Sequence, residues 1–219
     1  MRLVLILFEI GYFFQHIASI FQIIKIIKKK NSELISLETN VLFLIGAFAR
    51  IGWVWDSMLH KYILSYIEVG LAIATLVYLI YLYQKNKVRN YAINEVKLPP
   101  YLSLAALIPF SLILSFLFNP GESWFTDQYF VSLNIFSEAI GLLPQFYMIR
   151  KSHDTGDISE LYIVFLGIAR FCRLLFWIKM YFEGAKFFAL ILVDFLHCLV
   201  LSGFVYNVIK NWGGKGLPS

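Results

Sequence analysis

The chain has 219 residues, of which 59% are hydrophobic and only 15% are charged, and its mean hydropathy is +0.71. A soluble globular domain is about half apolar and about one quarter charged. This composition excludes an ordinary soluble domain and predicts an integral membrane protein.

The apolar runs predict seven membrane-spanning helices, because a helix needs roughly 20 apolar residues to cross a bilayer. The first run begins at Leu3 and continues without a small-residue cleavage site, so we expect a spanning helix and no cleaved signal peptide. Polar breaks such as Lys28–Ser32, Gln84–Lys87 and 119–121 separate the runs. The predicted helices cover residues 3–25, 36–57, 62–84, 100–118, 126–149, 159–180 and 186–209.

Basic residues gather in alternate loops, which predicts the orientation of the chain because cytoplasmic loops are enriched in lysine and arginine. The opposite side carries only Arg2, Lys61 and Lys186. We therefore expect a lumenal N-terminus and a cytoplasmic C-terminus. The net charge of +5 is then explained by topology and by contact with lipid headgroups, and we expect no nucleic-acid partner. The predicted cytoplasmic set is Lys25, Lys28, Lys29, Lys30, Lys85, Lys87, Arg89, Lys97, Arg150, Lys151, Lys210 and Lys215.

Five residues of the first half recur, without a gap, 123 positions later in the second half. We therefore predict one all-α membrane domain over 1–219, with repeat A at about 3–84, a linker helix at about 100–118 and repeat B at about 126–209. Two three-helix halves joined by a single helix share one orientation, so the repeats are parallel and sites are expected at their interface. The pairs are Gln22 and Gln145, Ile35 and Ile158, Ser36 and Ser159, Val41 and Val164, and Arg50 and Arg173.

Charged residues inside the predicted helices point to a site, because a charge at the bilayer centre costs about 2.5–3.5 kcal/mol on insertion scales. One interpretation is that these groups pair with each other and only hold helices together. However, Arg50, Arg170 and Arg173 outnumber Glu138, the acid nearest to them in register. We therefore expect an anionic ligand to complete the site, and a guanidinium favours a carboxylate or phosphate because it donates two parallel hydrogen bonds.

Three further residues are candidates, each with a structural alternative. His16 is a candidate pH sensor, because an unperturbed histidine titrates at about 6.5, but a hydrogen-bonded core histidine is the alternative. Trp177 lies one turn after Arg173 and either walls a cavity or anchors the helix at the interface. Lys179 either binds the ligand or extends its amine to the headgroups.

The sequence also lacks the patterns typical of catalytic and metal-binding sites. The sequence contains no zinc-spaced histidine and cysteine set, no phosphate-binding loop and no nucleophile elbow. We therefore predict no enzyme, no metal and no cofactor.

Two stretches of the chain resemble the ER lumen protein-retaining receptors, also called KDEL receptors, in a pattern that covers most of the sequence. The pair Pro144-Gln145 also marks the broader PQ-loop and SWEET-like proteins, so the combined run carries the resemblance. In the first half the run is Ile35-Ser36, Val41-Leu42-Phe43 and Ala49-Arg50. In the second half it is Ser137-Glu138, Leu143-Pro144-Gln145, Thr155-Gly156, Ile158-Ser159, Leu166-Gly167, Arg170, Trp177 and Phe182-Glu183-Gly184, with Leu217-Pro218 in the tail.

The resemblance implies a receptor that shuttles between Golgi and ER. It implies that arginines in a lumen-facing cavity bind the C-terminal Lys/His-Asp-Glu-Leu signal of escaped ER residents, and that cytosolic coat proteins carry the complex back. It also implies tighter binding in the more acidic Golgi. The positions that match the family's site are Arg50, Glu138, Arg170 and Trp177, while Lys179 and His16 lie one residue from a further family arginine and histidine.

The sequence is also compatible with two other functions. A SWEET-like transporter of a small anion would suit the arginines, although Pro144 has Phe21 at the repeat-equivalent position and the two halves are therefore unequally hinged. A divergent family member that no longer binds a ligand would instead be an accessory subunit, and its partners would be other subunits of a membrane complex.

Overall fold

The computed structural model describes residues 2–29, 35–56, 61–89, 98–119, 121, 126, 128–151, 156–184 and 188–215. Within these residues the seven predicted helices are confirmed, and most of them extend somewhat beyond the predicted ends. They are α1 (Arg2–Lys29), α2 (Leu37–Asp56), α3 (Ile63–Arg89), α4 (Leu104–Leu117), α5 (Gln128–Lys151), α6 (Gly156–Phe182) and α7 (Phe188–Lys215), with a 3₁₀ turn η2 (Pro100–Leu102) before α4.

The predicted helix over 100–118 is divided in two. Pro99 and Pro100 start η2, and Ser103 then adopts an extended backbone with φ −78° and ψ 157° before α4 begins. Proline suits a first helical turn because its missing N–H would have no partner there. The remaining helix α4 has only 14 residues, fewer than the roughly 20 that a full span needs.

The surface of the bundle is suited to lipid. In the described part of the chain, α1, α2, α3, α6 and α7 are the five helices long and apolar enough to cross a membrane. On α3, Ile63, Ile67 and Leu71 are exposed at four-residue spacing and therefore lie on one face. Contiguous apolar exposure of this kind is rare in water-soluble monomers. The architecture is that of a seven-helix membrane protein, as the sequence predicts.

Helix α5 is less apolar because it is buried among other helices. It packs against α2, α4 and α7, and its polar residues Asn134, Ser137, Glu138 and Gln145 are all buried. Polar side chains inside a membrane protein face the protein interior because lipid offers them no partners. The polar character of α5 therefore marks it as the helix that carries internal contacts.

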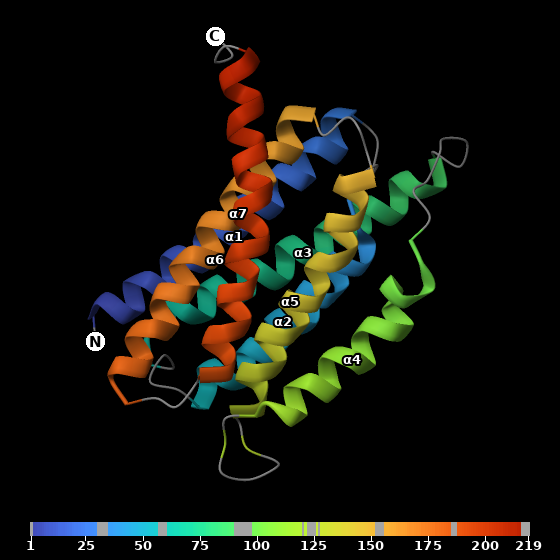
Figure 1. Cartoon of the computed structure of the whole chain (residues 1–219). Coiled ribbons are helices and arrows are strands. Elements are labelled where there is room, and N and C mark those ends of the chain that lie inside the picture. The colour runs from blue at the N-terminus through green and yellow to red at the C-terminus, as the bar shows by residue number, and fades with distance from the viewer. Residues whose placement is uncertain are drawn as a thin grey trace.

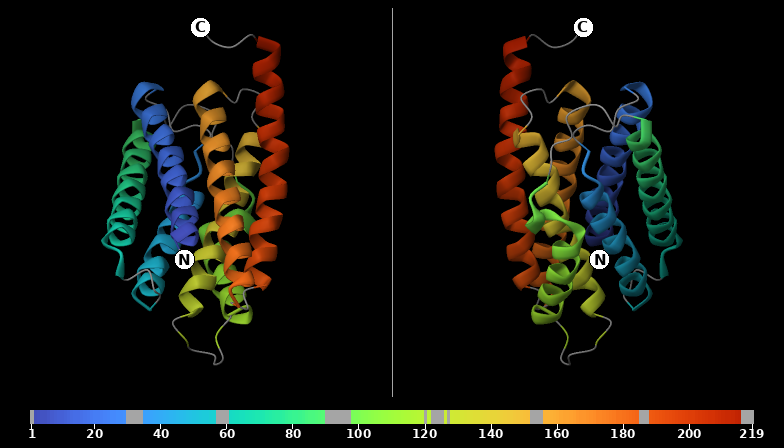
Figure 2. Two further views of the ribbon diagram at one scale, coloured as in Figure 1. Left: turned by 90° about the vertical axis from the view of Figure 1, so that its left-hand side faces the viewer. Right: turned by 90° about the vertical axis from the view of Figure 1, so that its right-hand side faces the viewer.

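The helices are arranged as two related groups of three. Figure 1 shows α2 and α5 side by side in the bundle, with α4 against α5, and Figure 2 shows α3 and α7 on opposite sides. Helix α1 packs on α6 and α2 on α5, while α3 packs on α1 and α2 and α7 packs on α5 and α6. These pairs map onto each other when α1, α2 and α3 are exchanged for α5, α6 and α7. This is the packing expected of two repeats, whose residue limits stay a prediction.

Two close helix approaches obey the same offset of 123 residues as the sequence repeat. A Cβ added at Gly11 on α1 would lie 3.2 Å from the carbonyl oxygen of Ala169 on α6. A Cβ added at Gly46 on α2 would lie 3.2 Å from the carbonyl oxygen of Asn134 on α5. Gly11 is equivalent to Asn134, and Gly46 to Ala169. The two interfaces between the repeats are therefore copies of one another.

Gln145 of the Pro-Gln pair has a direct structural role at the start of α2. The Ser36 hydroxyl accepts a hydrogen bond from the backbone N–H of Thr39 at 3.1 Å, which makes Ser36 the N-cap. The N–H of Ser36 in turn donates to the side-chain oxygen of Gln145 on α5 at 2.9 Å. Gln145 thus attaches the first turn of α2 to α5. The side chain of the equivalent Ser159 lies outside the described residues.

The helix ends agree with the predicted separation of charge. The C-terminal ends of α1, α3, α5 and α7 lie at one end of the bundle in Figure 2, and Lys28, Lys85, Lys151 and Lys210 near those ends are exposed. Lys30, Lys97 and Lys186 lie outside the described residues. Which end faces the cytoplasm stays a prediction, since it rests on the charge rule alone.

The close approach at Gly46 gives a test of the fold. We expect Gly46→Ala to destabilise the protein by about 1–3 kcal/mol, because the new Cβ would lie 2.8 Å from the Ser137 hydroxyl and 3.1 Å from Glu138 Cγ. Gly70→Ala is the matched control, because nothing lies within 4 Å of its new Cβ. Thermal unfolding in detergent should show a lower Tm for Gly46→Ala alone. Equal Tm values in both variants would contradict the packing described.

Candidate functional site

The central group of the candidate site is the carboxylate of Glu138 on α5. One of its oxygens, Oε2, accepts hydrogen bonds from Nη1 of both Arg170 and Arg173 on α6. The other, Oε1, accepts from the side-chain amide of Gln15 on α1 at 3.1 Å. All four side chains are buried. One carboxylate therefore neutralises charge from two arginines and joins three helices.

The Asn134 amide adds a further bond to the same carboxylate. When the amide is turned so that its oxygen accepts from the Tyr12 hydroxyl at 2.8 Å, its nitrogen donates to Glu138 Oε1 and to the carbonyl of Gly46, each at 3.2 Å. This orientation satisfies every polar atom of the amide. Glu138 then accepts four hydrogen bonds, which is about the full capacity of a carboxylate.

Arg173 is fully committed inside the protein. Its Nε donates to Asp194 Oδ2 on α7 at 2.7 Å, its Nη2 donates to Asp194 Oδ1, and its Nη1 donates to Glu138. His197 lies one turn further along α7, where its Nε2 donates to the carbonyl of Ala139 at 3.0 Å. A bidentate pair with a second carboxylate on the third nitrogen engages all three nitrogens of Arg173. Its geometry gives it a bracing role between α5 and α7.

Arg50 on α2 is held more loosely. Its Nη2 lies 3.2 Å from Glu68 Oε1 on α3, and its guanidinium carbon lies 3.7 Å from the centroid of the Tyr12 ring. Its Nε and Nη1 make no hydrogen bond with any described residue although they are buried. Arg170 is similar: Nη1 binds Glu138, while Nε and Nη2 have no described partner. Unpaired buried donors are uncommon in proteins and favour a site that binds an acceptor.

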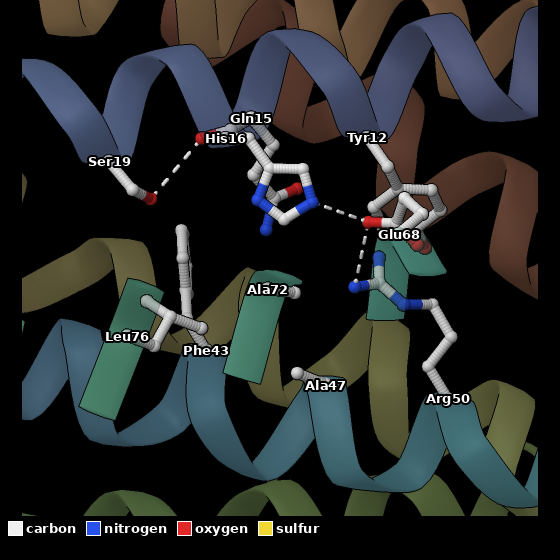
Figure 3. Close-up of a pocket in the computed structure, with 10 residues that line it drawn as sticks. All are labelled: Tyr12, Gln15, His16, Ser19, Phe43, Ala47, Arg50, Glu68, Ala72 and Leu76. Carbon is white, nitrogen blue, oxygen red and sulfur yellow. Dashed lines mark hydrogen bonds and ion pairs between the residues drawn. The ribbon is translucent and has the colours of Figure 1, made fainter. Parts of the chain in front are cut away.

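A small polar pocket lies beside Arg50, between α1, α2 and α3. Figure 3 shows His16 and Arg50 on either side of Glu68, with Gln15 and Ser19 further along α1. The empty space in the pocket, including open solvent at its mouth, is about 240 Å³. Part of that space lies outside the protein, so the enclosed part of the pocket is smaller. The structure therefore has a narrow pocket on one face of the arginine network.

The prediction that the arginines of the site outnumber its carboxylates is wrong for the described residues. Arg50 lies against Glu68, Arg173 against Asp194, and Arg170 and Arg173 share Glu138, so three arginines meet three carboxylates. In the sequence, Glu138 alone among the acids is close in register to these arginines. The acids on α3 and α7 enter the site from helices far along the chain.

Trp177 belongs to an aromatic cluster one turn beyond the arginines. Its ring centroid lies 5.8 Å from that of Trp53 on α2 and 4.8 Å from that of Phe176, and Phe8 on α1 packs on Trp53 at 5.3 Å. Trp177 is almost fully buried, at 1% exposure. The cluster therefore covers the arginine network on the side where α2 and α6 end.

Lys179 is separate from the other predicted site residues. Its amine lies 3.4 Å from Glu183, and the two side chains are 43% and 37% exposed. His16, by contrast, lines the pocket and lies 2.8 Å from Glu68 Oε1, so it is hydrogen-bonded as the structural alternative expected and also faces the candidate site. The structure thus brings Arg50, His16 and the Glu138 network together and leaves Lys179 on the surface.

Sequence reasoning did not include Glu68 and Tyr12 in the site. A signal was present on α1, where Tyr12 and His16 are four residues apart, as are Gln15 and Ser19, and Tyr12 and Gln15 are three apart. That spacing places them on one helical face. A polar stripe on a membrane helix marks the side that faces the protein interior.

Comparison with known proteins gives one family. A family model described as ER lumen protein retaining receptor matches residues 31–180, a span that includes every predicted ligand-binding residue but not His16. An ER lumen protein-retaining receptor of Kluyveromyces lactis is 28% identical over 96% of this chain and 98% of its own length. One of Entamoeba histolytica is 30% identical over 80% and 78%. ER lumen protein-retaining receptor 2 of Homo sapiens is 29% identical over 90% and 92%.

The Glu138 network predicts a large stability effect. We expect Glu138→Gln to destabilise the protein by about 3–5 kcal/mol, because it leaves Arg170 and Arg173 buried side by side without the shared carboxylate. Glu183→Gln removes an acid from an exposed pair with Lys179 and should cost less than about 1 kcal/mol. Thermal unfolding in detergent measures both. A Tm for Glu138→Gln as high as that of Glu183→Gln would refute the central role of this carboxylate.

Proposed function

This chain belongs to the ER lumen protein-retaining receptor family, and we propose that it binds the C-terminal retention signal of ER-resident proteins at Arg50 and Arg170 within the membrane. The signal is a peptide of the Lys/His-Asp-Glu-Leu type. The receptor returns its bound proteins from the Golgi to the ER, and cytosolic coat proteins carry the complex. Family membership alone implies a multi-pass membrane receptor of the ER and Golgi system.

The observation that carries the proposal is the state of Arg50. It is buried at 1% exposure, lines the polar pocket, and keeps Nε and Nη1 without a partner among the described residues. The Nε–H points away from Nη1, so these two nitrogens face different sides of the guanidinium. A carboxylate in the place of Glu68 could accept in parallel from Nη2 and from one of them. The terminal carboxylate of the signal is the ligand group that suits such a pair of parallel donors best.

The other predicted residues have supporting roles in this proposal. Arg170 offers Nε and Nη2 to a second carboxylate of the acidic signal, and Glu138 and Arg173 hold Arg170 in place. Trp177 walls the site through the aromatic cluster. Lys179, exposed beyond that cluster, would meet the acidic side chains of the arriving peptide. His16 is the pH sensor of the pocket.

Binding requires the pocket to widen. A tetrapeptide is larger than the present space of about 240 Å³, so helices or aromatic side chains around it must move. The exposed lysines at the C-terminal ends of α1, α3, α5 and α7 form the face that would meet cytosolic coat proteins, with the N-terminus then lumenal.

A second candidate function is an accessory subunit of a membrane complex. The observation that favours it is the balance of three arginines against three carboxylates, which holds the bundle together without a ligand. An accessory subunit would be recovered from mild detergent with a fixed partner in equal amount. Peptide binding is the measurement that separates the two functions.

We expect a peptide ending in His-Asp-Glu-Leu to bind the purified protein, and a C-terminally amidated peptide not to bind, because amidation removes the carboxylate. Arg50→Lys should weaken binding about 10- to 100-fold, because lysine keeps the charge but lacks the two parallel donors. Lys61→Gln, which removes an exposed cation, is the control and should bind as the wild type does. Equal binding of free and amidated peptides would exclude carboxylate recognition.

A second prediction concerns pH. We expect tighter peptide binding at about pH 5.5 than at about pH 7.4, with the difference lost in His16→Gln, because histidine changes charge in this range. His153→Gln, which alters a histidine of the predicted cytoplasmic loop, should keep the difference. Fluorescence polarisation with a labelled peptide at both pH values measures it. A pH dependence that survives in His16→Gln would show that another group senses pH.

A further inference from the structure

Glu68 connects the candidate pH sensor to the candidate ligand-binding arginine. It lies on α3, almost fully buried, with His16 Nε2 of α1 at 2.8 Å and Arg50 Nη2 of α2 at 3.2 Å. Both contacts use the same oxygen, Oε1, while Oε2 accepts no hydrogen bond from any described residue. Figure 3 shows Glu68 between the two side chains on the wall of the pocket.

The contact between Glu68 and Arg50 is weak in comparison with its counterpart in the second repeat. Arg173, the repeat equivalent of Arg50, binds Asp194 through two nitrogens and two oxygens. Arg50 binds Glu68 through one nitrogen and an oxygen that His16 also contacts. A bidentate pair is stronger and more fixed in geometry than a single bond. Glu68 is therefore the carboxylate of this network that an incoming carboxylate can most easily displace.

The charges around His16 set the direction of the effect. Glu68 is the charged group in direct contact with it, and Arg50 lies beyond Glu68. Glu9, two turns away on α1, accepts from Ser65 at 2.8 Å, and the arginines of α6 facing α1 are bound to Glu138. Protonation of His16 therefore adds positive charge next to Glu68 and strengthens its hold on that carboxylate in competition with Arg50.

We propose that Glu68 is an internal competitor that occupies Arg50 when no ligand is bound, and that protonated His16 draws Glu68 away so that a carboxylate ligand can take its place. The identity of that ligand as a peptide C-terminus rests on the proposed function above. Glu68 is then a positioning residue of the site. It acts on affinity through Arg50 and transmits the charge state of His16.

The test uses the purified full chain in lipid nanodiscs and a labelled peptide ending in His-Asp-Glu-Leu. We expect Glu68→Gln to bind the peptide about tenfold more tightly than the wild type at about pH 7.4, and with little change at about pH 5.5. The ratio of the affinity at about pH 5.5 to that at about pH 7.4 is then smaller in the variant than in the wild type. Glu9→Gln removes a carboxylate from the facing helix but not from Arg50, and should keep the wild-type ratio. Weaker binding by Glu68→Gln at both pH values, or an unchanged ratio, overturns the proposal.

A second variant covers the case in which Glu68→Gln does not fold. Glu68→Asp keeps the charge but shortens the side chain by one methylene, so its contact with Arg50 is longer. We expect its affinity at the higher pH to lie between those of the wild type and Glu68→Gln. An affinity equal to that of the wild type would count against competition.

Acetate separates this inference from the proposed function, because it offers a carboxylate without a peptide. Competition predicts that millimolar acetate raises the Tm of Glu68→Gln, or of Glu68→Asp, more than that of the wild type. If neither the wild type nor the variants bind the peptide, but acetate still raises the Tm of the variant more than that of the wild type, the proposed function fails and the inference stands. An equal acetate effect on variant and wild type overturns the inference.

Discussion

The structure depends on the carboxylate of Glu138. Two guanidinium groups inside a bilayer would each cost several kcal/mol if left unpaired, and Arg170 and Arg173 lie one turn apart on the same helix. Glu138 accepts from both, and its second oxygen accepts from Gln15 on the first helix. The carboxylate therefore converts two unfavourable charges into a contact that fixes α5 against α1 and α6. Asp194 extends the same contact to α7.

The position of this carboxylate follows from the duplication of the fold. Gln15 and Glu138 are 123 residues apart, so they occupy equivalent places in the two repeats and hydrogen-bond to each other where the repeats meet. Trp53 and Phe176 are equivalent in the same way, with centroids 6.3 Å apart. A two-fold arrangement brings equivalent residues together only near its axis. The first repeat has the neutral amide of Gln15 at this position and the second has the carboxylate of Glu138. The two positions are therefore equivalent in the fold but differ in charge.

Much of this was predictable from the sequence, and the rest required the packing of helices. Long apolar runs with charged ends define helices locally, and identical residues at a fixed offset define the repeat. The partners of the arginines were not predictable, because Glu68 and Asp194 reach Arg50 and Arg173 from helices further along the chain. Helix α5 looked like a spanning segment with one unusual acid. Its buried polar residues are explained only by the helices that surround it.

The asymmetry between the repeats locates the part of the protein that can respond to a ligand. In repeat B, Arg173 spends every nitrogen on Glu138 and Asp194, so moving α7 relative to α6 would break a bidentate ion pair in a low-dielectric interior. In repeat A, Arg50 gives one nitrogen to an oxygen shared with His16, and the pocket lies directly beside it. Moving α3 away from α1 and α2 breaks single hydrogen bonds but no bidentate ion pair. Widening of the pocket therefore costs the least free energy in repeat A. There, the unpaired nitrogens of Arg50 can donate hydrogen bonds to the carboxylate that replaces Glu68.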